Sequence, residues 1–139
     1  MSPDDLDRIE RELAISLPRA YRAALSPFPV PACRGNSDRD LWDDAEELIA
    51  WNRSLRAGSF GAPPWPTRMF SVGTAGASSC YAIDLDAERA PVWWVDQWRF
   101  DAKGTGIVSS SFEAWLEEYV RDLRNDCVAD GIAPDEDHS

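Results

Sequence analysis

A glycine-rich stretch, VGTAGASS at residues 72–79, is the first place where the residue types could do chemistry. Glycine-rich loops can cradle phosphate, but a Walker loop also needs a lysine after its second glycine, and a dinucleotide-binding loop must open a helix. Here no lysine follows Gly76, and the next residues, CYAIDL, have the composition of a strand. The stretch therefore predicts the turn of a β-hairpin with glycines at positive φ.

Four acidic residues around two predicted strands form a second candidate site. Asp84 and Asp86 alternate with Leu85 at one strand end, Glu88 follows in a turn, and Asp96 lies on the next strand. Carboxylates gathered in this way can hold a divalent cation or act as an acid–base pair. The commoner explanation is a solvated strand end, so we expect no catalytic residue and no metal site.

Histidine and cysteine add little further chemistry. The single histidine, His138, is the second-last residue of an acidic tail, where it cannot be held against a nucleophile. Cys33, Cys80 and Cys127 contain no CxxC pair, and their odd number argues against a disulfide framework. We expect buried thiols and no cofactor. We also expect a cytoplasmic protein, because residues 1–10 lack a signal-peptide pattern and no apolar run reaches membrane length.

Charge is concentrated at the C-terminal end of the sequence. The formal net charge is −11, and residues 111–139 carry nine acids and two bases, which gives −7. Nucleic acid is excluded as an expected ligand, because phosphate contacts require clustered lysine and arginine. The charge favours a protein partner with a basic surface, and solubility alone is the alternative explanation.

The hydrophobic pattern predicts helices at both ends of the chain and strands between them. A helix is expected from Ser2 to Leu17, where Pro18 ends it, because Ser2 is a good cap and apolar residues recur at helical spacing. The order predicts one α+β domain over residues 1–130, an antiparallel β-meander packed with N-terminal and C-terminal helices, and an acidic, flexible tail at 131–139. The other predicted helices are residues 19–25, a segment capped by Asp43 that ends before Gly58, and a segment capped by Ser110 with Glu113 as its box partner; the predicted strands are residues 69–72, 79–85, 91–98 and 107–108.

Tryptophans lie on both faces of the third predicted strand. Alternation groups Trp94 with Val92 and Asp96, and with Trp98 if the strand stays regular, whereas Trp93 groups with Val95. Helices are expected to cover one of these faces. The other face is either a second part of the core or a partner surface, since tryptophan and arginine are favoured at interface hot spots.

Four sequence segments resemble the SUKH superfamily (SMI1/KNR4-like) when they are taken in order. They are IERELAISLPRAYR at 9–22, FSVGTAGASSCYAIDL at 70–85, VWWVD at 92–96 and SFEAWLEEY at 111–119. Ala14 departs from the glycine that usually follows the leucine of the first segment. The loop has Ala77-Ser78-Ser79 where members often have Gly-Asp.

The resemblance implies an α+β fold without catalytic activity. It also implies an immunity protein that binds and neutralises a cognate secreted toxin, often a nuclease or another nucleic-acid-targeting enzyme delivered by contact-dependent or type VI secretion. The alternatives are a regulatory protein–protein interaction module and an enzyme that uses the carboxylate cluster with a metal. The oligomeric state is left open. The residues expected to contact the partner are Asp84, Asp86, Glu88, Trp93, Asp96, Trp98, Arg99, Glu117, Glu118 and Asp122.

Overall fold

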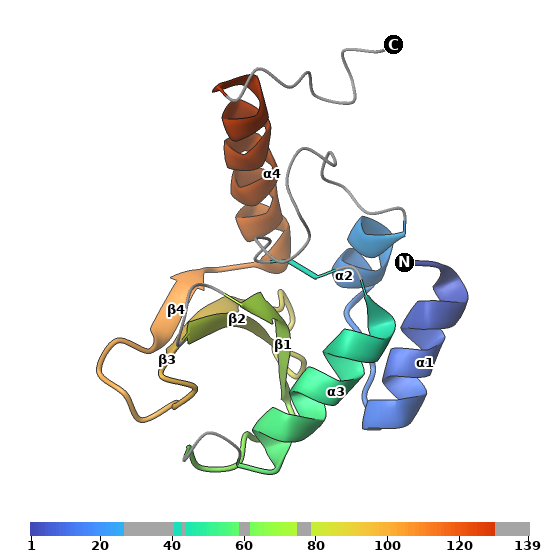
Figure 1. The fold of residues 1–139 in the computed structure, drawn as a ribbon, viewed down its shortest axis with the longest axis vertical. Helices are drawn as coiled ribbons and strands as arrows, with labels where there is room; N and C mark the ends of the chain where they lie inside the picture. The colour runs from blue at the N-terminus through green and yellow to red at the C-terminus, as the bar shows by residue number, and fades with distance from the viewer. Residues whose placement is uncertain (27–40, 43, 59–61, 75–78, 130–139) are drawn as a thin grey trace.

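Helices flank an antiparallel meander in this protein (Figure 1). The computed structural model describes residues 1–26, 41–42, 44–58, 62–74 and 79–129. The predicted α+β class and antiparallel meander are confirmed, with each strand paired to its neighbour in the order β1-β2-β3-β4. The elements are α1 (Pro3–Leu13), α2 (Arg19–Leu25), α3 (Ala45–Arg56), β1 (Met69–Thr74), β2 (Ser79–Asp84), β3 (Val92–Asp96), β4 (Gly106–Ser109) and α4 (Phe112–Ala129).

The glycine-rich stretch lies in the β1–β2 hairpin, as predicted. Thr74 is opposite Cys80 and Met69 is opposite Asp84 in an antiparallel ladder. The strands on both sides of residues 75–78 therefore confirm the hairpin. Gly73 itself lies within β1, opposite Tyr81, and is not among the described glycines with positive φ, so its predicted place in the turn was wrong. The turn at 75–78, the loop at 27–40 and the acidic tail at 131–139 lie outside the described residues.

Helix α1 starts where predicted and ends earlier. The Ser2 side chain accepts a hydrogen bond from the N–H of Asp5, and the Asp5 carboxylate accepts one from the Ser2 N–H, so the first turn carries a full capping box. The helix ends at Leu13 because Ala14 adopts the left-handed conformation, with φ 54°. The predicted end at Leu17 was therefore wrong, although Leu17 is still buried.

A carboxylate from α1 holds the bend that follows. Glu10 accepts hydrogen bonds from the Leu17 N–H at 2.7 Å and from Arg22 of α2 at 2.9 Å. Arg22 also pairs with Asp7 at 2.7 Å. These contacts bring α2 back against α1 and place the apolar sides of both helices toward the sheet.

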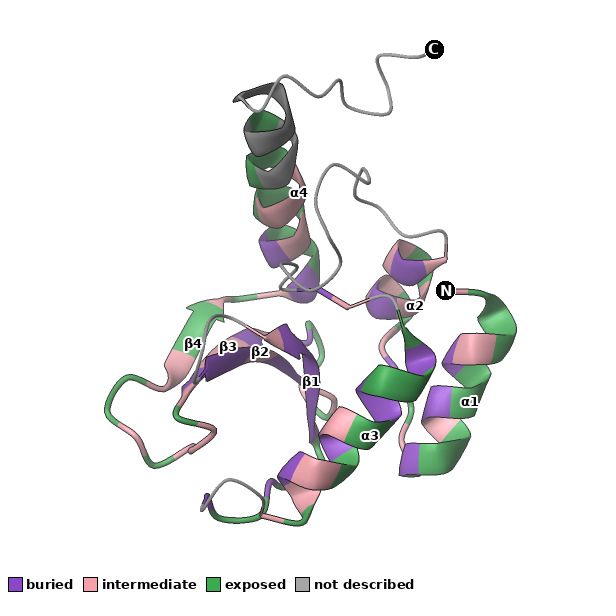
Figure 2. Ribbon diagram, viewed as in Figure 1, coloured by how far each residue is buried: buried purple, intermediate pink, exposed green. Residues whose placement is uncertain are grey.

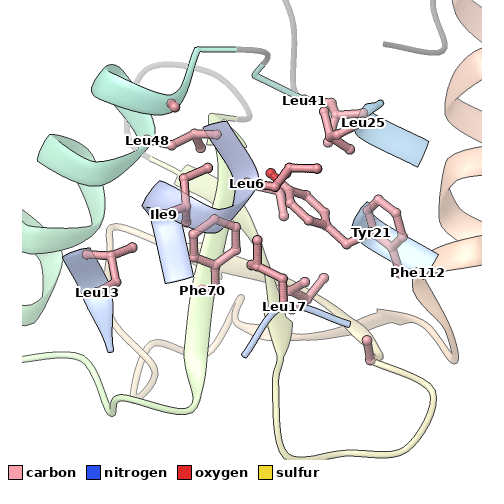
Figure 3. Close-up of a cluster of buried hydrophobic side chains, with 14 of the residues drawn as sticks. Leu6, Ile9, Leu13, Leu17, Tyr21, Leu25, Leu41, Leu48, Phe70 and Phe112 are labelled. Carbon is pink, nitrogen blue, oxygen red and sulfur yellow. The ribbon is translucent and has the colours of Figure 1, made fainter. Parts of the chain in front are cut away.

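The main core lies between the helices and one face of the sheet (Figure 3). Tyr21 is fully buried there, with its ring edge-on to Phe70 at 5.5 Å and to Phe112 at 5.4 Å. Such aromatic pairs each add roughly 0.5–1.5 kcal/mol beyond the burial of their area. Helix α2, strand β1 and the start of α4 are therefore joined through one side chain.

The opposite face of the sheet is covered by a smaller, aromatic cluster. Its buried members include Leu55, Trp65, Cys80 and Val95, and partly buried tryptophans and Phe100 pack around them. Trp65 comes from the segment between α3 and β1, and Phe100 comes from the loop between β3 and β4. Both faces of the sheet thus carry buried core residues. Trp93 packs against this aromatic cluster, whereas Trp94 points to the other face, and both tryptophans are half-buried.

Strand β3 is shorter than predicted, and this moves Trp98. The strand ends at Asp96, and Gln97 and Trp98 have φ of 53° and 59°. The reversal carries the Trp98 ring to the aromatic cluster, where it lies 5.1 Å from Trp51. Trp98 therefore packs on the face of Trp93 and Val95, and the grouping with Trp94 that a regular strand predicted was wrong.

A side-chain amide from α3 closes the outer edge of β1. Asn52, which is 1% exposed, donates to the Ser71 carbonyl at 3.1 Å and accepts from the Ser71 N–H at 2.8 Å. Its amide also donates to Leu48 of its own helix, and Trp51 donates to the Ser71 hydroxyl at 2.8 Å. Asn52 thus pairs with the strand as a neighbouring backbone would, at the site of a β-bulge between Ser71 and Gly73.

Both helix caps predicted downstream were one residue early. Asp44, and not Asp43, caps α3 by accepting from the Glu47 N–H at 2.9 Å. Ser111, and not Ser110, caps α4 by accepting from the Ala114 N–H at 3.1 Å. Each cap lies in a run of equivalent capping residues, and the packing of the helix decides which of them is used.

Replacing Asn52 by alanine is expected to destabilise the fold strongly. Asn52→Ala leaves the Ser71 N–H and carbonyl buried without their α3 partner, and such losses cost about 1–3 kcal/mol per group, so we expect a loss of roughly 2–4 kcal/mol. Urea unfolding followed by tryptophan fluorescence measures it. Asn125→Ala, an exposed asparagine of α4, is the matched control and should change stability by less than about 0.5 kcal/mol.

Replacing Ala14 by glycine is expected to stabilise the protein. An L-residue in the left-handed region costs about 1–2 kcal/mol and glycine does not, so Ala14→Gly should gain roughly 0.5–1 kcal/mol after the entropy of the unfolded chain is included. The control is Ala57→Gly, at the right-handed C-cap of α3 (φ −79°), which should lose stability. Equal effects of the two substitutions on the melting temperature would contradict the explanation.

Candidate functional site

A groove lies between α2, the turn that joins β2 to β3, and the first turn of α4. Its volume is about 720 Å³. The small side chains Ala20 and Ala23 line the α2 side, and residues 85–90 form the opposite wall. Two hydrogen bonds shape that wall: the Asp84 carboxylate accepts from the Asp86 N–H at 3.0 Å, and the Arg89 carbonyl accepts from the Phe112 N–H at 3.2 Å.

Exposed carboxylates continue from this groove along α4. Asp86, Glu88 and Glu113 line the groove, together with Arg19 and Arg89. Glu117 is one helical turn beyond Glu113. We call the following set the acidic surface; all its members are exposed, and none forms an ion pair with another described residue: Asp86, Glu88, Glu113, Glu117, Glu118 and Asp122.

Glu113 belongs to this surface, although the sequence predicted that its side chain would cap α4. The predicted cap at Ser110 would have used Glu113 as its reciprocal partner. Since Ser111 is the cap instead, Ala114 takes that position, and the Glu113 side chain is exposed in the groove. The signal that finds it is the run of three serines at 109–111, which allows more than one cap.

Five of the ten predicted contact residues lie on the acidic surface. They are Asp86, Glu88, Glu117, Glu118 and Asp122. Asp84 lies beside it, only 15% exposed at its side chain and 3.9 Å from Arg68. Of the remaining four, Asp96, Trp98 and Arg99 lie toward the opposite end of the strands, whereas Trp93 is the second residue of β3 and packs against the aromatic cluster.

Asp96, Trp98 and Arg99 take part in the hydrogen bonds and ion pair that shape the loop between β3 and β4. Arg99 pairs with Asp101 at 3.1 Å, and its carbonyl accepts from the Thr105 hydroxyl at 2.6 Å. The Asp96 N–H donates to the same hydroxyl at 2.9 Å, and the Trp98 carbonyl accepts from Trp65 at 3.0 Å. These contacts hold the loop over the aromatic cluster, and a part for the four side chains in partner binding stays a prediction.

The carboxylates considered as a metal or acid–base cluster are not brought together. Ser79 pairs with Asp96 and Ile83 pairs with Val92, so Asp84 and Asp96 lie at opposite ends of the β2–β3 ladder. Within the described residues, no group of three or more histidine, cysteine or acidic side chains has the arrangement of a metal site.

Cys80 is the cysteine whose side chain the structure describes, and it is buried as the second residue of β2. Desolvation raises the pKa of the Cys80 thiol to about 12, although a hydrogen bond with Ser71 acts in the opposite direction. A nucleophilic cysteine needs a depressed pKa and access to solvent, so Cys80 has the properties of a core residue.

The ionisation of Cys80 predicts a specific pH dependence of stability. The unfolded thiol loses its proton near pH 8.5 while the folded one keeps it up to a pKa of about 12, so stability falls by about 1.4 kcal/mol per pH unit in that window. Urea unfolding of the wild type and of Cys80→Ala at pH 7 and pH 10 isolates this contribution. Between pH 7 and pH 10, the free energy of unfolding of the wild type should fall by roughly 2 kcal/mol more than that of Cys80→Ala. An equal change in the two proteins would contradict the burial of the thiol.

Comparison with known proteins places the chain in a family. Among curated proteins no match was found. Within the described residues, no helix has both the length and the apolar character that crossing a membrane requires. Residues 1–118 match the SMI1 / KNR4 family (SUKH-1). This match contains the whole sheet, all of α1 to α3 and the buried start of α4, and it covers most of the chain. The protein therefore belongs to the SMI1 / KNR4 family (SUKH-1).

Proposed function

We propose that this protein is an immunity protein that binds a cognate secreted toxin domain and blocks the surface with which the toxin acts. Family membership supports this proposal, because the SUKH family is generally associated with non-catalytic immunity proteins. The observation that carries it further is the acidic surface, whose six carboxylates are exposed and form no ion pairs with other described residues.

The acidic surface favours a toxin that acts on nucleic acid. A nuclease binds phosphates through clustered lysine and arginine, and those same side chains would be attracted to Glu113, Glu117 and Glu118. An acidic surface also raises the association rate with a basic partner before any contact forms. The immunity protein would thus compete with the nucleic acid for one basic site.

The groove gives this surface a shape as well as a charge. Arg19 and Arg89 lie among its carboxylates, so the groove presents both signs of charge within a short distance. A lysine or arginine of the toxin can pair with Asp86 or Glu113, and an acid of the toxin can pair with Arg19. A mixed pattern of this kind restricts which partner fits, because a misplaced like charge costs binding energy.

The proposed function predicts rescue from a toxic neighbour. The product of the gene adjacent to this one should be toxic when expressed alone, and co-expression of this protein should restore growth and yield a co-purified complex. A complex with a neighbour that is not toxic would indicate a regulatory interaction module instead. The absence of both toxicity and binding would overturn the proposal.

Neutralising the acidic surface is expected to slow association. In the triple variant Glu113→Gln, Glu117→Gln and Glu118→Gln, the association rate with the adjacent-gene product should fall about tenfold at low salt, and the difference should shrink as salt increases. Stopped-flow binding at two ionic strengths measures both effects.

A second triple variant serves as the matched control. It carries Asp4→Asn, Glu46→Gln and Glu47→Gln, which remove the same charge from exposed positions at the starts of α1 and α3. An equal decrease in both variants would mean that only net charge matters. That result would contradict a binding role for the acidic surface.

A further inference from the structure

The two edges of the sheet differ in whether other parts of the described chain form hydrogen bonds with them. At the outer edge of β1, Asn52 pairs with Ser71 through two hydrogen bonds, and the Val72 carbonyl accepts from the Trp42 N–H at 2.9 Å. At the outer edge of β4, none of the described residues forms a ladder or any other backbone hydrogen bond with the strand. Figure 1 shows β4 as the last strand of the sheet, with α3 on the side of β1.

The open edge also carries exposed apolar side chains. Ile107 is 57% exposed and Val108 is 54% exposed, and they are the exposed large hydrophobic residues of the described chain. Figure 2 shows β4 in the colours of exposed and intermediate residues, whereas β1 and β2 are largely buried. Edge strands are usually protected by a charged residue or proline, and the sequence GIVS of β4 contains neither.

A bulge interrupts the pairing of this strand with the sheet. Ser109 pairs with Val92 and Ile107 pairs with Trp93, so Val108 is the extra residue and has no partner on β3. A bulge and a length of four residues limit how far another strand can extend the sheet. The edge is therefore suited to a short extended segment rather than to unlimited sheet growth.

We propose that the outer edge of β4 binds an extended segment of the toxin as a fifth strand of the sheet. This inference rests on the proposed immunity function and names the place and mode of binding. Backbone hydrogen bonds to Gly106–Ser109 would provide the attachment, and apolar side chains of the segment would cover Ile107 and Val108.

Charge and size favour the toxin over a second copy of this chain as the occupant. A stable interface buries about 800 Å² per partner over roughly 20–30 residues, which a four-residue strand paired with itself does not approach. Two copies would also each bring a net charge of −11. A basic toxin, in contrast, can contact the edge and the carboxylates of α4 together, because α4 begins at Phe112, three residues after β4 ends at Ser109.

The chemistry of the segment follows from this neighbourhood. Strand β4 itself is uncharged, and Glu113 and Glu117 are exposed in the first two turns of the helix that follows. We therefore expect a segment with two or more β-branched or other apolar residues, and with lysine or arginine at the end that lies beside α4.

The test uses the complex of the full chain with the adjacent-gene product. Ile107→Thr/Val108→Thr keeps β-branched side chains and removes the apolar contact, and Val108→Pro places on the strand the residue type that protects sheet edges from pairing. We expect each variant to keep its far-ultraviolet circular dichroism and to raise the dissociation constant tenfold or more. Ala50→Thr, on the exposed side of α3 beside the opposite edge of the sheet, is the control and should bind like the wild type.

Amide hydrogen exchange provides a second measurement that does not depend on variants. In the complex, amides within residues 106–109 should exchange at least tenfold more slowly than in the free protein. A wild-type complex with unchanged exchange there, and with unaffected variants, would overturn the fifth-strand proposal and leave the immunity function standing. No complex with the wild type would overturn both, and protection that depends on the concentration of this chain alone would identify a second copy as the occupant.

Discussion

The pairing of Asn52 with the backbone of Ser71 is the constraint on which the arrangement of this protein depends. A strand edge beside a helix would leave an N–H and a carbonyl buried without partners, and each such group costs about 1–3 kcal/mol. One amide side chain satisfies both groups and fixes the rotation of α3 about its axis. Leu48 and Ile49 then face the main core, while Trp51 and Leu55 reach the aromatic cluster on the other side of the sheet.

Closing the edge at β1 makes the molecule asymmetric. Helix α3 and the Trp42 backbone occupy that side, so the only edge without a described partner is β4, at the far end of the meander. The acidic helix α4 starts from the same strand. The exposed apolar pair at β4 is therefore close in sequence to the carboxylates that α4 contributes to the acidic surface.

The sequence segments that resemble the family contribute mainly to the stability of the fold. Glu10 holds the α1–α2 bend, Tyr21 and Phe70 meet in the main core, and Phe112 joins them from α4. The carboxylates proposed to contact a partner are, in contrast, exposed and form no ion pairs with described residues. Their substitution changes charge without opening the core, so partner choice can vary on this fold at little cost in stability.

Several errors of the sequence-based prediction have one physical origin. Asp43 and Asp44, or Ser109 to Ser111, are equivalent as caps by residue type, and only the packing of α3 and α4 selects Asp44 and Ser111. The continuation of α1 to Leu17 was predicted from spacing, but the hydrogen bonds of Glu10 favour a left-handed turn at Ala14. Trp98 was placed by strand alternation, which ended two residues earlier than the pattern suggested.

The sequence by itself determined the α+β class, the order of helices and strands, the hairpin around the glycines and the family. These follow from hydrophobic periodicity and turn residues, which act over a few neighbouring positions. Only the tertiary structure decided which acids share a surface, that Asp84 and Asp96 are far apart, that Glu113 is exposed beside the groove and that β4 keeps an open edge. Those facts depend on strand register and on which side chains pair across the fold, and residues distant in the sequence set both.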